Sequence, residues 1–107
     1  MSVKQLSVTE LKNKIAQGEV LFLLDVREPH EFNYAHIAGS VLISLNQITQ
    51  RLGELDVHQE IIVICHHGIR SQQAANYLVH SGFKNIANLQ GGIDAWSREC
   101  DHLIPRY

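Results

Sequence analysis

The sequence predicts an α/β fold, with one open parallel sheet and helices on both of its faces. Two continuous apolar runs, residues 20–25 and 60–64, are typical of strands covered on both faces. Segments with helical spacing and capping residues separate these runs, and such alternation favours parallel strands joined by right-handed crossovers. At 107 residues the chain can build one core, so we expect a single domain over residues 1–107.

The first half of the chain carries clear helix signals. Ser7 and Glu10 form an S-x-x-E capping box, which predicts a helix that Gly18 can close. The first apolar run ends in Asp25, and Pro29 follows where the first turn of a second helix tolerates proline.

The second half repeats the alternation. Ser44 and Gln47 predict a second capping box before a short helix. After the second apolar run, Gly82 can end a helix whose apolar face consists of Ala74, Ala75, Leu78 and Val79. Residues 85–89 indicate a short third strand, and residues 91–99 a closing helix with Trp96 in the core.

Composition argues against several partners. The formal net charge is -2, and Lys and Arg are scattered, so we expect neither nucleic acid nor an anionic membrane as a partner. The apolar runs are too short to span a bilayer, and the N-terminal residues show no signal-peptide pattern. The two cysteines, Cys65 and Cys100, make no disulfide framework. A cytoplasmic protein with reduced thiols is therefore expected.

The segment "VICHHGIRS" holds the candidate chemistry. Cys65 follows a buried strand and precedes a helix, and ligands of open α/β sheets lie beyond such strand ends. Backbone N–H groups and the helix dipole can stabilise a thiolate there, and Gly68 lets several amides converge on one anion. Arg70 adds a planar cationic fork, while His66 and His67 add donors.

Other interpretations of these residues were weighed. Most free cysteines simply pack, but the neighbouring glycine, arginine and helix start favour a nucleophile at Cys65. Zinc binding by His66 and His67 would need a second pair of ligands at a suitable spacing, which the sequence does not offer. We therefore expect no metal. Cys100 lacks the glycine, arginine and helix start that accompany Cys65, so we expect no role for it.

Four segments carry motifs of one known family. Residues 23–32 look like an Asp-x-Arg signature, and residues 35–43 look like Gly-His-Ile-x-Gly-Ala. Residues 63–71 look like the family's active-site loop, and residues 91–96 look like Gly-Gly-x-x-Ala-Trp. With these motifs the chain resembles the rhodanese domains, which are single-domain sulfurtransferases. Ala35 and Ser40 depart from the second motif by small changes.

The resemblance implies a role for each matching residue. Cys65 would be the nucleophile that carries sulfur as a persulfide, and no organic cofactor would be needed. Asp25 and Arg27 would support the loop, pairing with it and with Glu28 or Glu31. His36 and Gly39 would shape the turn after the second motif. The substrate-binding cradle would be made by the backbone amides of His66, His67, Gly68, Ile69, Arg70 and Ser71.

The implied reaction has two halves. Cys65 takes the outer sulfur from thiosulfate or a similar small anionic donor, and then passes it to cyanide, a thiol or a thiol protein. Three alternatives stay open: a phosphatase or arsenate reductase on the same fold, a non-catalytic sulfur-carrier or binding module, and a thiol redox protein. The spacing Cys-x4-Arg, one residue shorter than the phosphatase loop, favours sulfur.

Overall fold

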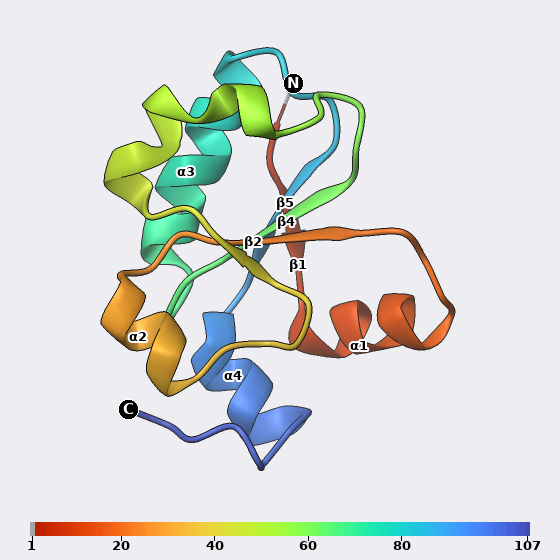
Figure 1. The fold of residues 1–107 in the computed structure, drawn as a ribbon. Coiled ribbons are helices and arrows are strands. Elements are labelled where there is room, and N and C mark those ends of the chain that lie inside the picture. Colours follow the sequence, from red (N-terminus) through yellow and green to blue (C-terminus); the bar gives the residue numbers. More distant parts are fainter. Residues whose placement is uncertain (1) are drawn as a thin grey trace.

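The computed structural model describes residues 2–107 as one five-stranded parallel sheet packed between helices (Figure 1). The strand order is β1-β5-β4-β2-β3, and every neighbouring pair is parallel. This confirms the predicted fold class. The strands are β1 (Lys4–Leu6), β2 (Phe22–Asp25), β3 (Val41–Leu42), β4 (Ile61–Ile64) and β5 (Ile86–Leu89).

The three central strands were all predicted: β2 and β4 match the two apolar runs, and β5 matches the short third strand expected at residues 85–89. Both edge strands were missed. β1 is three residues long and buries only Leu6, while β3 is two residues long and half-exposed, so neither leaves an apolar run in the sequence. An edge strand pairs through the backbone of its one neighbour, so its side chains need not form the apolar pattern that marks a buried strand.

The helices begin and end close to the predicted residues. The Ser7–Glu10 capping box is formed in both directions, and Pro29 occupies the first turn of its helix. Gly18 and Gly82 follow their helices with positive φ, and Trp96 is buried as expected. The α-helices are α1 (Val8–Ala16), α2 (Pro29–Tyr34), α3 (Ile69–His80) and α4 (Gly92–Glu99).

The second predicted capping box was wrong. Residues Leu45–Gln50 form a 3₁₀ helix, η1, followed by a short one at Leu52–Glu54, η2, and no side-chain cap forms at Ser44. The Ser44 hydroxyl instead donates a 2.8 Å hydrogen bond to the backbone carbonyl of Arg27. The Ser44 hydroxyl thus donates to a tertiary acceptor in the neighbouring loop instead of accepting from a local helix N–H, and this bond ties η1 to the end of β2.

The sheet buries a separate core on each face, because side chains alternate along each strand. Ile61, Val63 and Cys65 point into the core under α3 and η1, whereas Ile62 and Ile64 point into the core under α1 and α4. In Figure 1, α3 and α1 lie on opposite sides of the strands. Among residues 2–107, no helix combines the length and apolar character needed to cross a bilayer.

Candidate active site

The two strand ends singled out in the sequence lie next to each other. β2 and β4 pair in register so that Asp25 stands beside Ile64, the residue before Cys65. The backbone N–H of Val26 donates to the Ile64 carbonyl at 3.0 Å. The loop after β4 therefore starts at the carboxyl edge of the sheet, where open α/β folds place their ligands.

The Cys65 sulfur is buried and already accepts a hydrogen bond. Its residue is only 1% exposed, and the Gly68 N–H donates to Sγ at 3.0 Å. The Ser71 hydroxyl oxygen lies 3.2 Å from Sγ and also donates to the side-chain oxygen of Asn88. The single Ser71 proton can serve Asn88 or a Cys65 thiolate, so the hydroxyl must turn when the thiol loses its own proton.

The start of α4 holds the loop in this orientation. The Ile93 N–H donates to the Cys65 carbonyl at 2.9 Å, and the Asp94 N–H donates to the His66 carbonyl at 3.1 Å. Gly92 lies so close to these two carbonyls that any Cβ there would overlap them. Because the first two loop carbonyls face α4, the following amides are free to turn toward the sulfur.

The start of α3 supplies further donors. The Gln72 N–H closes the first helical turn on the Gly68 carbonyl, so the amides of Ile69, Arg70 and Ser71 have no acceptor within the helix. Gly68 itself adopts φ 104°, a conformation that brings its N–H onto Sγ. Of these groups, the Gly68 N–H contacts Sγ, and the other amides lie at the positive end of the helix dipole. Their role in cradling a bound anion stays a prediction.

The Arg70 side chain is engaged by a carboxylate from α2. Its Nη1 and Nη2 atoms donate to Glu31 Oε1 and Oε2 at 2.7 and 2.9 Å. The Arg70 hydrogen bonds hold the pKa of Glu31 well below its usual range, although burial works in the opposite direction. The sequence predicted Arg70 as part of the anion site, and its role toward substrate stays a prediction.

Asp25 and Arg27 form a fully buried pair. The Asp25 carboxylate accepts from Arg27 Nε and Nη2 at 2.9 and 2.7 Å, and Arg27 Nη2 also donates to the Ala35 carbonyl. Arg27 Nη1 donates to the Tyr107 hydroxyl at 2.8 Å and to the Glu31 carbonyl at 3.4 Å. The sequence predicted pairing with the loop, but the structure pairs these residues with each other and with backbone carbonyls around α2.

The two loop histidines stack rather than point at the sulfur. The His66 ring lies between His67 at 3.9 Å and Tyr107 at 3.8 Å, measured between ring centroids. Within residues 2–107, the buried Nε2 of His66 has no hydrogen-bond partner. Burial, with the neighbouring His67, lowers the pKa of His66 and so favours its neutral ring. Tyr107 reaches this place because the C-terminal segment runs back past α4 toward α2 (Figure 1).

The second cysteine is on the far side of the sheet. Cys100 packs against the core under α1 and α4, whereas Cys65 belongs to the core under α3, and both thiols are free. Cys100 therefore cannot act as a resolving thiol for Cys65 in this fold. No group of three potential metal-binding side chains occurs within residues 2–107.

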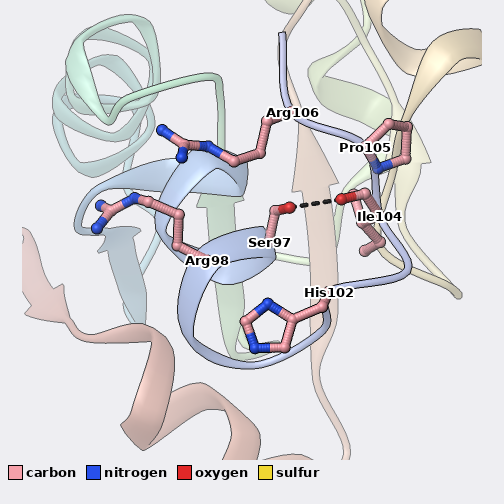
Figure 2. A pocket seen from close by; sticks show the side chains of 6 residues that line it. All are labelled: Ser97, Arg98, His102, Ile104, Pro105 and Arg106. Carbon is pink, nitrogen blue, oxygen red and sulfur yellow. Dashed lines mark hydrogen bonds between the residues drawn. The ribbon is translucent and has the colours of Figure 1, made fainter.

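A separate hollow of about 370 Å³ lies beside α4 and the C-terminal segment (Figure 2). It contains no residue of the 65–71 loop, so it is not the site of Cys65 chemistry. The two arginines that line it, Arg98 and Arg106, both form salt bridges with Asp94. The hollow is lined by Ser97, Arg98, His102, Ile104, Pro105 and Arg106.

Sequence reasoning missed several residues of the site. Tyr107 and Asn88 contact loop side chains from segments far away in the sequence, and no local pattern marks them. Glu31 was named only as a partner for Arg27, although its carboxylate binds Arg70. Gly92 was noted within a family motif, and its reason becomes visible only through its contact with the loop carbonyls.

Comparison with known proteins agrees with this geometry. A family model described as the rhodanese-like domain matches residues 7–99. The chain belongs to the rhodanese-like domain family. This membership accounts for the order of the motifs along the chain, including the loop between β4 and α3.

Three relatives illustrate the similarity. GlpE of Pseudoalteromonas translucida, named a thiosulfate sulfurtransferase, is 32% identical over 106 residues, which cover 99% of this chain and 100% of GlpE. The "Putative sulfur carrier protein YrkF" of Bacillus subtilis is 40% identical over 96 residues, 90% of this chain but only 52% of YrkF. The crystal structure of a rhodanese-like domain protein from Staphylococcus aureus matches with a TM-score of 0.85 at 27% identity, covering 98% of this chain and 99% of that one. The rhodanese-like domain of this chain is thus related to sulfurtransferases, and it matches about half of YrkF.

Proposed function

We propose that this protein is a sulfurtransferase that carries a sulfane sulfur on Cys65 as a persulfide. The observation that carries the proposal is the environment of Sγ, which is buried at the head of α3 with the Gly68 N–H at 3.0 Å. A persulfide anion would extend the sulfur by one atom toward the free N–H groups at the start of α3. Backbone N–H groups fixed before the reaction stabilise negative charge without reorganisation.

In the first half-reaction, the Cys65 thiolate attacks the outer sulfur of a donor such as thiosulfate. A new S–S bond forms to Sγ, the donor's S–S bond breaks, and its electron pair leaves with sulfite. In the second half, cyanide or a thiolate attacks the outer sulfur of the persulfide, and the Cys65 thiolate is regenerated. The two halves balance without an external oxidant, and they require a free thiol, which suits a reducing compartment such as the cytoplasm.

The loop favours sulfur over phosphorus as the transferred atom. Only four residues separate Cys65 from Arg70, and the Arg70 fork is filled by Glu31. A phosphoryl group needs donors for three oxygens around its central atom, whereas a single sulfur fits a narrow ring of amides. We therefore expect negligible hydrolysis of aryl phosphates.

A sulfur carrier is a second candidate, and the name of YrkF favours it. The same persulfide would form, but the acceptor would be one partner protein and turnover with small acceptors would be slow. The reaction at Cys65 is common to both functions, so the two candidates differ in the acceptor alone.

The test is thiocyanate formation from thiosulfate and cyanide, assayed beside hydrolysis of p-nitrophenyl phosphate. Cys65→Ser should abolish thiocyanate formation, and Cys100→Ser should leave it unchanged, because Cys100 lies on the other side of the sheet. A Cys65→Ser protein with full activity would refute the proposal. Cys65-dependent phosphate hydrolysis that is faster than sulfur transfer would replace it with a phosphatase.

A further inference from the structure

The guanidinium of Arg70, at the end of the active-site loop, is already paired with a carboxylate. Arg70 stands within the loop, yet both of its terminal nitrogens donate to the Glu31 carboxylate, at 2.7 and 2.9 Å. In this two-bond geometry each guanidinium N–H that could bind a substrate oxygen on that edge already has an acceptor. An anionic donor would have to displace Glu31 to use the fork.

Glu31 is itself held in place from three directions. Its Oε1 accepts from the Glu28 N–H at 3.1 Å, and its Oε2 accepts from the Tyr107 hydroxyl at 2.8 Å. That hydroxyl in turn accepts from the buried Arg27. The Glu31 side chain is 10% exposed, against 34% for Arg70. The carboxylate is therefore the fixed partner, and the arginine is the one that can swing away.

The pair removes net charge from the site. Arg70 and Glu31 together carry none, and Arg70 is close enough to Cys65 for the sulfur's charge to raise its pKa, after the larger effect of Glu31. Burial lowers the pKa of His66, which disfavours a positive charge on its ring. What remains to attract an anion is the set of backbone dipoles at the head of α3. Such dipoles can balance one negative charge better than two.

We infer that Glu31 is a positioning residue that sets donor specificity: by holding Arg70, it favours sulfur donors with one negative charge over dianions such as thiosulfate. The inference rests on the proposed sulfur transfer through Cys65. It concerns only which donors load the thiol, and it leaves the second half-reaction unchanged.

Two sulfur donors of nearly equal size undergo the same transfer to Cys65 but differ in net charge, so they test the effect of donor charge alone. Thiosulfate carries two negative charges and releases sulfite; methanethiosulfonate, in which a methyl group replaces one oxygen, carries one and releases methanesulfinate. In both, Cys65 Sγ bonds to the outer sulfur while the S–S bond breaks and its electrons leave with the oxidised sulfur. Charge is balanced in each case, and the persulfide formed is the same.

The experiment measures kcat and KM for both donors, with cyanide as acceptor, in the wild-type protein, Glu31→Gln and Glu54→Gln. Freeing Arg70 lets it donate to the second charge of thiosulfate. Glu31→Gln should therefore raise the ratio of kcat/KM for thiosulfate to that for methanethiosulfonate by about tenfold, the effect of one hydrogen bond to a charged group. Most of the change should appear in KM for thiosulfate.

Glu54→Gln is the matched control, because Glu54 also accepts two hydrogen bonds from one arginine, here from Nε and Nη2 of Arg51 at 2.7 and 2.8 Å, outside the site. In Glu54→Gln, the ratio of kcat/KM for thiosulfate to that for methanethiosulfonate should equal the wild-type ratio. Arg70→Gln provides a second variant, in which Glu31 keeps its hydrogen bonds from the Glu28 N–H and the Tyr107 hydroxyl. It should lower the thiosulfate ratio, because the Glu31 charge is then uncompensated, and in the Glu31→Gln background it should cancel the gain.

The outcomes separate this inference from the function beneath it. If Cys65 takes sulfur from both donors but neither Glu31→Gln nor Arg70→Gln changes the ratio, the specificity role is overturned and the sulfurtransferase stands. If neither donor places sulfur on Cys65 in the wild-type protein, the proposed function fails and the inference is overturned with it. A gain in Glu31→Gln that persists without Arg70 would also overturn the inference.

Discussion

Replacing Gly92 by alanine should displace the backbone of the active-site loop. A Cβ at this position would stand 2.5 Å from the His66 carbonyl oxygen and 2.6 Å from its carbon, and closer still to the Cys65 oxygen. Real Cβ atoms essentially never approach other atoms within 3.0 Å, so the loop or α4 must move by about half an ångström or more. The movement falls on the two carbonyls whose orientation frees the following amides for the sulfur.

The cost to stability has two parts. Gly92 has φ 58°, and a side chain in that left-handed region costs about 1–2 kcal/mol. Overpacking against the loop adds about 1–3 kcal/mol. A loss of about 2–5 kcal/mol leaves most small domains folded, since their total stability is about 5–15 kcal/mol. Activity should fall further, because a misplacement of about 1 Å can cost two orders of magnitude in rate, so we expect a loss of about 10- to 100-fold.

The assay is kcat/KM for thiosulfate with cyanide as acceptor, together with the free energy of unfolding in urea. Gly18→Ala is the matched control, because Gly18 has φ 74° but no atom within 4 Å of its added Cβ. It should cost about 1–2 kcal/mol of stability and leave the kinetics unchanged. Full activity in Gly92→Ala, at a temperature where it is folded, would refute the idea that α4 orients the loop.

Three further predictions concern the residues around the thiol. Asp25→Asn should lower the free energy of unfolding by about 3–5 kcal/mol, because it leaves the Arg27 charge buried without its partner; a loss below about 1 kcal/mol would contradict this. The pKa of Glu31 is lowered in the folded state, so its stabilisation is present above the unfolded value of about 4.3 and is lost as pH falls below it. The difference in melting temperature between wild type and Glu31→Gln should therefore shrink under acid conditions, and a constant difference from pH 7 to acid would disprove the linkage. Ser71→Ala should lower kcat/KM by about tenfold, the value of one hydrogen bond to the Cys65 thiolate, and unchanged kinetics would count against that contact.

The central part of the fold could be predicted because burial leaves a pattern in the sequence. β2 and β4 are covered on both faces, so each is marked by a continuous apolar run, and β5 is a short, mostly apolar strand that is also buried throughout. The capping box predicted for α1 and the Pro29 that marked the start of α2 are also local signals, since each lies within one turn of its helix start. The prediction of a nucleophile at Cys65 also rests on local features, because strand end, glycine and helix start are adjacent in the chain, and its chemistry stays a prediction.

The rest depends on partners that are distant in sequence. Ser44 has an ordinary capping pattern, but the Arg27 carbonyl takes its hydroxyl once β2 and η1 meet. Arg70 has the position of an anion ligand, but Glu31 takes its fork from 39 residues away. Tyr107 reaches His66 only after the chain has folded back past α4. These choices are made by packing between elements, which a local pattern does not record.

The central claim is that Cys65 carries the transferred sulfur, and the most direct test is the mass of the intact protein. After incubation with thiosulfate and removal of excess donor, the wild-type protein should gain one sulfur atom and lose it on addition of cyanide. Cys100→Ser should behave in the same way, and Cys65→Ser should gain nothing, because its loop has no thiolate to attack the donor. Sulfur found only on Cys100, or a wild-type protein that gains no sulfur from either thiosulfate or methanethiosulfonate, would contradict the claim.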